Sequence, residues 1–324
     1  MTELLMLLTF PEPVRREYED ALRAGFPEVT LRMVDHVDKL EPFIESAEVL
    51  MTFGPMLMDR AGPLLGRARN LKWIQALGTG VDNIADVPTL PDRVQITNIR
   101  GIHGAPVSEA ALMAMLALSR GLPRTVRNQD RKAWERWPAR LLDGKTVGIL
   151  GVGQIAEVLA PKCKAFGMTV VGISSATRSL PGFDRMADRG KLAGAVGELD
   201  YLVLLTPYTT ETRHLVNAKV LAAMKPTSYL INLARGGVVD EEALLQALQQ
   251  KQIAGAALDV FSTEPLPATH PFWSLPNVII TPHMGGFCDI YARLALPTIQ
   301  DNLHQFLKGN MQNMTNIVSR QAPV

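Results

Sequence analysis

The stretch TVGILGVGQIA, residues 146–156, decides the fold of this chain. Its first five residues form a short apolar run typical of a buried strand, and a helical pattern of about 14 residues follows it. Between them lies a G-x-G-x-x-A turn. Gly151 allows a tight bend, Gly153 lets the backbone approach a pyrophosphate, and Ala156 is small enough for close helix–strand packing. A strand, this turn and a helix in that order predict a dinucleotide-binding loop.

Further apolar runs follow this loop at regular spacing. They predict five more strands, TVVGI (169–173), LDYLVLLT (199–206), SYLINLA (228–234), IAGAALDVF (253–261) and NVIIT (277–281). The spacers NAKVLAAM and EEALLQALQQ between them have helical patterns. An open sheet of six strands joined in this way is the Rossmann dinucleotide-binding fold.

The residues before this loop also alternate between strand and helix patterns. Five apolar runs predict strands: Leu4–Phe10, Val29–Val34, Glu48–Phe53, Leu71–Leu77 and Val94–Ile99. Helices are expected at Val14–Ala24, Leu40–Ala47 and 106–121, the last with Gly121 at its end. A final helix at about 288–308 can return to pack on the first domain.

The fold class is therefore α/β with two doubly wound domains. A flavodoxin-like substrate domain comprises residues 1–101 and 288–324, and a Rossmann domain of residues 102–287 is inserted into it.

The amino-acid composition excludes several classes of function. The 324 residues carry 33 Lys and Arg against 32 Asp and Glu, so neither nucleic acid nor another polyanion is an expected partner. The basic residues Arg131, Lys132, Arg136 and Arg140 are expected on one solvated helix face. The chain has two cysteines, and their number and spacing predict neither a disulfide framework nor a zinc site. No apolar run reaches the ~20 residues that span a bilayer, and we expect a cytoplasmic protein.

The end of the run TVVGI bears on cofactor choice. An acidic residue there would bind a ribose 2′-hydroxyl, but this chain has Ser174 and Ser175, followed by Thr177 and Arg178. Hydroxyls and a guanidinium suit a 2′-phosphate, so NADP(H) is favoured and NAD(H) is possible. The alternative is that Arg178 is only a solvated loop residue.

Three polar residues directly follow strands of the predicted Rossmann sheet. Arg235 follows SYLINLA, Glu264 lies just beyond the strand ending at Phe261, and His283 follows NVIIT. Ligands of open α/β sheets bind outside the carboxyl ends of the strands. Reduction of a ketone needs a cation for the carbonyl oxygen and a proton donor, and these roles suit Arg235 and His283. A carboxylate beside the imidazole stabilises its protonated form.

Two other segments are weaker candidates. Among the remaining five histidines, His103 in GIHGAP lies beside a predicted hinge and could take part in chemistry. In the first domain, Gly78-Thr79-Gly80 follows the run LKWIQAL. Its N–H groups could form a nest for a substrate carboxylate, or the segment is a plain glycine-rich turn.

Over essentially its whole length the chain resembles the D-isomer-specific 2-hydroxyacid dehydrogenases. The matching segments are LGTGVDNI (77–84), GILGVGQIA (148–156), TPYTTETRHLV (206–216), NLARGGVVDEEAL (232–244), ALDVFSTEPLP (257–267) and TPHMGG (281–286). The resemblance places the family's catalytic residues on Arg235, Glu264 and His283.

The resemblance also implies binding residues and a homodimer. Cofactor contacts are expected at Gln154, Ile155, Thr206, Pro207, Thr212, Leu233, Ala234 and Gly285, with Asp259 holding the nicotinamide carboxamide. The substrate side of the cleft would comprise Phe53, Gly54, Leu77, Gly78 and Thr79. The 106–142 region would form the dimer contact. Because it lacks an acidic residue at position 174, the chain resembles more closely the glyoxylate and hydroxypyruvate reductases that use NADPH.

Two alternatives remain on the same scaffold. One is a dinucleotide-sensing regulator like the family's corepressors, which the intact Arg, Glu and His disfavour. The other is a formate- or phosphite-type dehydrogenase, disfavoured because LGTGVDNI contains no lysine. The function expected is an NAD(P)-dependent oxidoreductase that interconverts a small 2-oxo acid and its D-2-hydroxy acid, of the glyoxylate or hydroxypyruvate type.

Overall fold

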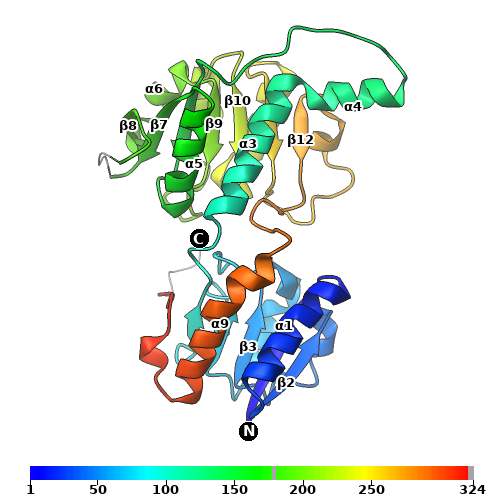
Figure 1. Ribbon diagram of the computed structural model, residues 1–324, viewed down its shortest axis with the longest axis vertical. Helices are drawn as coiled ribbons and strands as arrows, with labels where there is room; N and C mark the ends of the chain where they lie inside the picture. Colours follow the sequence, from blue (N-terminus) through cyan, green and yellow to red (C-terminus); the bar gives the residue numbers. More distant parts are fainter. Residues whose placement is uncertain (177–179, 320–324) are drawn as a thin grey trace. The chain divides into compact units, whose positions relative to one another are not determined.

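The computed structural model describes residues 1–176 and 180–319. These divide into two compact units (Figure 1). Unit 1 comprises Met1–Ile102 together with the chain from Asp289 onward, and unit 2 comprises His103–Cys288. In the described residues, no helix is both long enough and apolar enough to span a membrane.

Unit 1 is built on a parallel sheet of five strands in the order β2-β1-β3-β4-β5. The strands are β1 Thr2–Leu7, β2 Val29–Val34, β3 Val49–Thr52, β4 Trp73–Ala76 and β5 Gln95–Thr97. This order is that of flavodoxin-like folds, as predicted. Every residue of β3 and β4 is buried, because the two strands lie inside the sheet and both of its faces are covered.

Helices from both ends of the chain cover this sheet. They are α1 Glu12–Gly25, α2 Ala61–Arg67 and α9 Tyr291–Leu307, with 3₁₀ turns η1 Val37–Leu40, η2 Gly54–Arg60 and η7 Met311–Asn313. Figure 1 shows α1 and α9 side by side, and the two helices are in contact. The last helix therefore does return to the first domain.

The helix predicted at Leu40–Ala47 is wrong. The chain there forms η1 and successive turns, in which Phe43 and Ile44 both donate to the carbonyl of Leu40. Pro42 has no N–H to continue a helical ladder. The apolar spacing is real, since Leu40, Ile44 and Ala47 are buried, but it reflects packing of turns rather than of a helix.

Unit 2 contains a parallel sheet of seven strands in the order β12-β11-β10-β9-β6-β7-β8. The strands are β6 Thr146–Leu150, β7 Thr169–Ser174, β8 Arg185–Asp188, β9 Tyr201–Leu204, β10 Tyr229–Asn232, β11 Gly255–Leu258 and β12 Val278–Ile280. Counted from β6, the first six strands follow the order 3-2-1-4-5-6 of a Rossmann sheet, and β12 adds a seventh. All six predicted strands are present. The sequence missed β8, an edge strand whose residues RMAD carry no buried apolar run.

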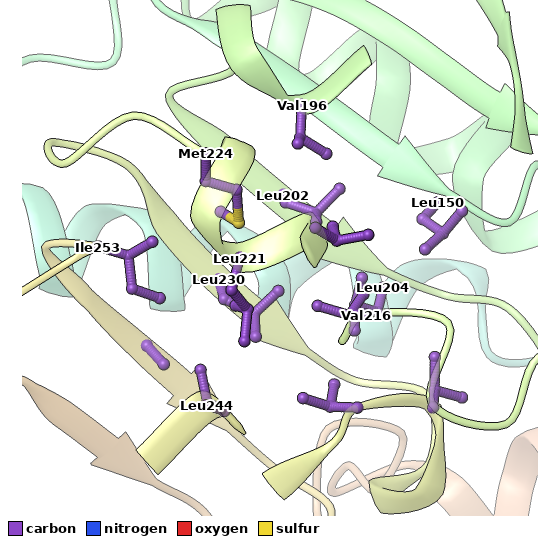
Figure 2. Close-up of a cluster of buried hydrophobic side chains, with 14 of the residues drawn as sticks. Leu150, Val196, Leu202, Leu204, Val216, Leu221, Met224, Leu230, Leu244 and Ile253 are labelled. Atoms are coloured by element: carbon purple, nitrogen blue, oxygen red, sulfur yellow. The ribbon is translucent and has the colours of Figure 1, made fainter. Parts of the chain in front are cut away.

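Alternate residues along these strands contribute to two hydrophobic layers, one on each face of the sheet. On one face, Leu202, Leu204 and Leu230 pack with Leu221 and Met224 from α7 Ala218–Ala223 and its end, as Figure 2 shows. The helices α6 Leu192–Ala195 and α8 Glu241–Gln249 lie in the same layer. The opposite face holds α3 Gly104–Arg120 and α5 Gln154–Ala165, which pack on each other. Helix α3 ends at Gly121 in the left-handed conformation, as predicted.

The segment after α3 differs from expectation. Helix α4 Leu122–Asp130 extends away from the sheet of its own unit, and an irregular segment leads back to β6 (Figure 1). Arg131, Lys132, Arg136 and Arg140 are exposed, as predicted, but they follow α4 and do not lie on a helix. Lys132 has φ 56°, a left-handed conformation that stops the helix.

Candidate active site

The residues predicted to carry the chemistry lie at one edge of the sheet of unit 2. Because its strands are parallel, their carboxyl ends share an edge. Six predicted residues lie at or just beyond those ends: Gly151 after β6, Ser174 at the end of β7, Thr206 after β9, Arg235 after β10, Asp259 after β11 and His283 after β12. The fold thus gathers them within one unit.

The glycine-rich loop has the shape that a dinucleotide needs. Gly151 has φ 99°, and a methyl group built on it would lie 2.5 Å from the backbone nitrogen of Thr206, so only glycine fits. At Gly153 a methyl group would meet no protein atom within 4 Å, which leaves open space beside the start of α5. The first N–H groups of this helix, including those of Gln154 and Ile155, have no partner within it. That space and the positive end of the helix dipole fit a pyrophosphate.

The end of β7 carries hydroxyls and no carboxylate. Ser174 Oγ accepts a hydrogen bond from Ala176 N at 3.2 Å, and Ser175 is exposed. Asp188 of β8 is in register with Ser174, but its carboxylate accepts a hydrogen bond from Gly190 N. The predicted Thr177 and Arg178 lie outside the described residues.

Hydrogen bonds within the loop after β9 fix its conformation. The hydroxyl of Thr212 donates to the carbonyl of Pro207 at 2.7 Å and accepts from Thr209 N at 2.7 Å. Thr212 is buried, so its hydroxyl fixes the loop. Thr206 and Pro207 begin the loop at the carboxyl edge. The cofactor contact predicted for Thr212 is untested, but its hydroxyl is already engaged.

The turn that presents Arg235 is fixed by Asn232. Its side-chain oxygen accepts from Ala234 N at 3.1 Å, and its amide nitrogen donates to the Arg235 carbonyl at 3.0 Å. Leu233 and Ala234 lie within this turn. A methyl group on Gly236 would lie 2.0 Å from the Phe261 carbonyl carbon, so the turn packs directly on the chain after β11. This contact places Arg235 beside the segment that leads to Glu264.

Glu264 and His283 form a direct pair. Glu264 Oε2 lies 2.6 Å from His283 Nδ1, and Glu264 Oε1 accepts from Phe261 N at 2.9 Å. Burial raises the pKa of the Glu264 carboxyl, but the hydrogen bond and charge of His283, the Phe261 N–H and the charge of Arg235 together hold it below its usual value. With Nδ1 engaged, Nε2 is the nitrogen available for proton transfer to a ligand.

Asp259 organises the turn that carries His283. Its carboxylate accepts the Thr281 hydroxyl at 2.5 Å, Met284 N at 2.9 Å and Gly285 N at 2.8 Å. Its backbone carbonyl accepts His283 N at 2.8 Å. His283 has φ 52°, a left-handed conformation that is rare for a residue with a side chain. These hydrogen bonds stabilise that conformation and hold the imidazole in place.

Comparison with known proteins identifies the family. The profile described as D-isomer specific 2-hydroxyacid dehydrogenase, NAD binding domain, matches residues 112–285. The chain is 32% identical over 315 residues to D-3-phosphoglycerate dehydrogenase of Methanocaldococcus jannaschii, a match that covers 93% of this chain and 58% of that protein. It is 37% identical over 229 residues to glyoxylate/hydroxypyruvate reductase A of Serratia proteamaculans, with 69% and 73% covered. The chain belongs to the D-isomer-specific 2-hydroxyacid dehydrogenase family.

Solved structures agree with this family. A family protein from Aeromonas salmonicida superimposes with a TM-score of 0.85 at 33% identity, over 99% of this chain and 100% of that chain. The NADPH-dependent glyoxylate/hydroxypyruvate reductase of Sinorhizobium meliloti, in complex with NADP and sulfate, gives 0.82 at 27% identity over 100% of both chains. Unit 2 is therefore the nucleotide-binding domain of an NAD(P)-dependent 2-hydroxyacid dehydrogenase.

In this dehydrogenase the predicted substrate residues lie at the carboxyl edge of the sheet of unit 1. Phe53 and Gly54 follow β3, while Leu77, Gly78 and Thr79 follow β4. A methyl group on Gly78 would lie 3.4 Å from the Phe53 ring, so the two loops are in contact. The carbonyls of Gly78 and Thr79 accept hydrogen bonds from Ile99 N and the Asn98 side chain, which fixes the loop after β4.

Sequence reasoning missed two aromatic residues at this edge. The Phe10 ring lies 5.5 Å from that of Phe53, edge to face, and the Tyr291 ring lies 6.0 Å from it. The Tyr291 hydroxyl donates to the Leu77 carbonyl at 2.8 Å. Phe10 could have been found because it is the last residue of the first apolar run. Tyr291 gave no such signal, because it is distant in sequence and reaches the site only through the position of α9.

Proposed function

We propose that this chain is an NAD(P)-dependent oxidoreductase that interconverts a small 2-oxo acid and its D-2-hydroxy acid. The observation that carries the proposal is the 2.6 Å contact between Glu264 Oε2 and His283 Nδ1, at the edge where Arg235 also lies. An imidazole paired with a carboxylate is an acid–base group that works near neutral pH. A guanidinium beside it supplies the cation that an oxo acid needs.

Each residue of the triad has one task in this reaction. Arg235 forks onto the substrate carboxylate and carbonyl oxygen, which orients the substrate and stabilises charge on that oxygen. Bound reduced nicotinamide supplies the hydride that reduces C2. His283 donates a proton from Nε2 to the same oxygen, and Glu264 stabilises the protonated imidazole before that donation. In the oxidation direction His283 accepts the proton.

The cofactor site combines the loops at the carboxyl edge of unit 2. The residues proposed to hold the nucleotide are Gly151, Gly153, Gln154, Ile155, Ser174, Ser175, Arg178, Thr206, Pro207, Thr212, Leu233, Ala234, Asp259 and Gly285. NADP(H) is the favoured cofactor, with NAD(H) possible. The hydroxyls at the end of β7 and the lack of a carboxylate there support this choice. The NADP complex of the Sinorhizobium meliloti reductase also supports it.

The substrate is proposed to be small, of the glyoxylate or hydroxypyruvate type. Phe53, Gly54, Leu77, Gly78 and Thr79 are proposed as its contacts in unit 1. The rings of Phe10, Phe53 and Tyr291 crowd the same edge, which disfavours a bulky side chain. The reductase of Serratia proteamaculans, 37% identical to this chain, supports the same substrate class.

A homodimer is proposed through the 106–142 region. Large apolar side chains are exposed along it: Met113, Leu116, Leu122, Val126, Trp134 and Leu141. Trp134 is 89% exposed, and so much apolar surface on one projecting segment is typical of an interface between subunits. A sizing column coupled to light scattering tests this directly, and a monomer would contradict it. The cytoplasmic location stays a prediction.

One assay tests the proposed reaction. Consumption of NADPH and of NADH should be followed with a panel of 2-oxo acids that includes glyoxylate, hydroxypyruvate, pyruvate and branched-chain oxo acids. We expect turnover with the two smallest polar substrates and a preference for NADPH. Nucleotide binding without turnover of any substrate would instead favour the regulator-like alternative, which the relatives described above do not support.

A further inference from the structure

Tyr291 joins the start of α9 to the loop that follows β4. It is the first residue of the helix and is only 3% exposed, and its hydroxyl donates to the Leu77 carbonyl at 2.8 Å. Its ring lies beside that of Phe53, with 6.0 Å between the centroids. All three residues belong to unit 1. The hydroxyl therefore engages the backbone of the loop, while the ring packs at the same edge of the sheet.

The hydrogen bond to Leu77 sets the direction of the next N–H group. A peptide unit is planar, and in its trans form the C=O and N–H bonds point in opposite directions. The Leu77 carbonyl and the Gly78 N–H belong to one such unit, so a donor that fixes the carbonyl also fixes the N–H. Within residues 1–176 and 180–319, no acceptor receives the Gly78 N–H. This N–H is therefore available to a ligand.

Other hydrogen bonds fix the backbone on either side of this peptide unit. Leu77 N donates to the Thr52 carbonyl at 2.9 Å, and the Gly78 carbonyl accepts from Ile99 N at 3.2 Å. Thr52 ends β3, and Ile99 lies just beyond β5, so these bonds come from the two strands that flank β4. The bond from Tyr291 acts on the peptide unit between them and comes from a helix near the other end of the chain.

Contacts other than this hydroxyl hold α9 against the sheet. Asn302 donates to the Gln75 side chain at 2.9 Å, and Phe306 stacks on Trp73 with 5.6 Å between ring centroids. These residues lie about three and four turns beyond Tyr291 on the same helix. Loss of the Tyr291 hydroxyl alone should therefore leave the helix in place.

We propose that Tyr291 is a positioning residue for the carboxylate of the substrate. Through the Leu77 carbonyl it orients the Gly78 N–H, which donates to a carboxylate oxygen of the bound 2-oxo acid. The inference rests on the proposed function, since it requires the loop after β4 to bind this acid. The task of the Tyr291 hydroxyl is distinct from that of the Phe53 ring, which faces the side chain of the substrate.

The test removes the hydroxyl and keeps the ring. Tyr291→Phe should raise the KM for glyoxylate about 3- to 10-fold, the loss expected for one uncharged hydrogen bond. The kcat should stay within about twofold, because the carboxylate keeps its charge throughout the reduction and is bound equally in the ground and transition states. The cofactor dissociation constant should not change.

Tyr201→Phe is the matched control. Tyr201 is also buried, and its hydroxyl lies 2.6 Å from Ser119 Oγ, but it stands at the start of β9 in unit 2, at the edge opposite to the proposed site. Loss of this hydroxyl should lower the unfolding temperature and leave KM unchanged.

A comparison of two substrates separates carboxylate binding from packing around the side chain. Glyoxylate and hydroxypyruvate share the carboxylate and differ in the group attached to the carbonyl carbon. Tyr291→Phe should therefore raise both KM values by the same factor. Phe10→Ala, which removes a ring that lies 5.5 Å from that of Phe53, should change the two KM values by different factors.

The inference fails in an active enzyme if Tyr291→Phe leaves KM within about twofold, or if it lowers kcat as much as it raises KM. It also fails if Tyr201→Phe raises KM equally, or if the two substrates respond to Tyr291→Phe by different factors. If Tyr291→Phe does not fold, hydrogen exchange at the Gly78 amide of the parent enzyme with bound NADPH decides. Oxamate, an unreactive analogue of a 2-oxo acid, should slow this exchange, and unchanged exchange would overturn the inference. A parent protein that reduces no 2-oxo acid with either cofactor overturns the proposed function as well, and that result is distinct from the others.

Discussion

The backbone carbonyl of Asp259 accepts a hydrogen bond from His283 N at 2.8 Å, while the Asp259 carboxylate binds the N–H groups of Met284 and Gly285. His283 is therefore held by the residue after β11 as well as by its own strand, β12. Glu264, the partner of its imidazole, lies five residues after Asp259 on the same segment. One segment thus fixes both the backbone and the ring of the proposed acid.

Asp259→Asn should reduce turnover through the position of His283. An amide cannot accept all three hydrogen bonds, and its NH₂ group would face an N–H donor. We expect kcat to fall about 100-fold, the typical effect of a misplacement of about 1 Å. Asp240→Asn is the control, because Asp240 caps α8 through Ala243 N and lies outside the proposed site. It should change the unfolding temperature only slightly and leave kcat unchanged. Equal kcat in both variants would contradict the role of Asp259.

His283→Ala should lose most of its turnover and keep its cofactor affinity. Loss of general acid–base catalysis typically costs about 10²–10⁴-fold. Steady-state rates and a fluorescence titration with the reduced cofactor measure the two effects. His270→Ala, which changes a loop histidine that bonds Phe272 N, should behave like the parent. Turnover within a few-fold of the parent would contradict the assignment of His283 as the acid–base residue.

Glu264→Gln should move the pH profile of reduction to lower pH. The pKa of Glu264 lies below its ordinary value, so the carboxylate is ionised throughout the neutral range. Its stabilisation of the imidazolium is lost only as the pH falls through that lowered pKa. Without the carboxylate the proton donor is populated only under more acidic conditions. The pH dependence of kcat/KM measures the shift. Glu241→Gln, which removes a carboxylate bonded to nearby Ser262 N, should not move the profile. An unmoved profile in Glu264→Gln would leave this residue with a structural role only.

Arg235→Lys should be a poor replacement. Lysine keeps the charge but cannot fork onto two oxygens. Loss of one charge-assisted hydrogen bond corresponds to about 10- to 100-fold in kcat/KM for the oxo acid. Arg185→Lys, in a surface pair with Glu198, is the control. If kcat/KM survives within about threefold, the bidentate anchor is wrong.

NADPH should be preferred over NADH, and the preference should depend on the end of β7. Ser174→Asp should shift it towards NADH, because a carboxylate accepts from a ribose 2′-hydroxyl and repels a 2′-phosphate. Arg178→Ala should weaken NADPH selectively, by about 10- to 100-fold if the guanidinium bonds the phosphate. Thr169→Asp, at the exposed opposite end of the same strand, should change neither. A parent enzyme that favours NADH would contradict this interpretation of Ser174 and Ser175, and would leave Arg235, Glu264 and His283 unaffected.

Much of the fold followed from local patterns. The runs TVGIL and TVVGI became β6 and β7 because buried parallel strands need continuous apolar residues. The glycine turn between β6 and α5 was readable because its backbone conformation demands glycine at position 151. By contrast, β8 and the turns at Leu40–Ala47 were misjudged. In these segments neighbouring strands and Pro42, rather than the apolar period, determine the local structure.

Only part of the candidate site could be predicted from the sequence. Arg235 and His283 could be chosen because each directly follows a strand. The part played by Asp259 in holding His283 depends on hydrogen bonds that bridge 24 residues of sequence, and no local pattern encodes them. The same is true of Tyr291, whose hydroxyl bonds a carbonyl 214 residues away. His103 could not be ranked from sequence, because its contact with Gly286 depends on where α3 begins in the fold.

The last helix also has a consequence for how the protein is made. Asn302 of α9 donates to the buried Gln75 side chain of β4 at 2.9 Å, and Phe306 stacks on Trp73 with 5.6 Å between ring centroids. The ribosome must synthesise all of unit 2 before it reaches these residues. During the synthesis of unit 2, part of the core of unit 1 therefore remains uncovered, whereas unit 2 can already fold. Chaperones that bind apolar nascent chains would find their target in the first hundred residues rather than in the nucleotide domain.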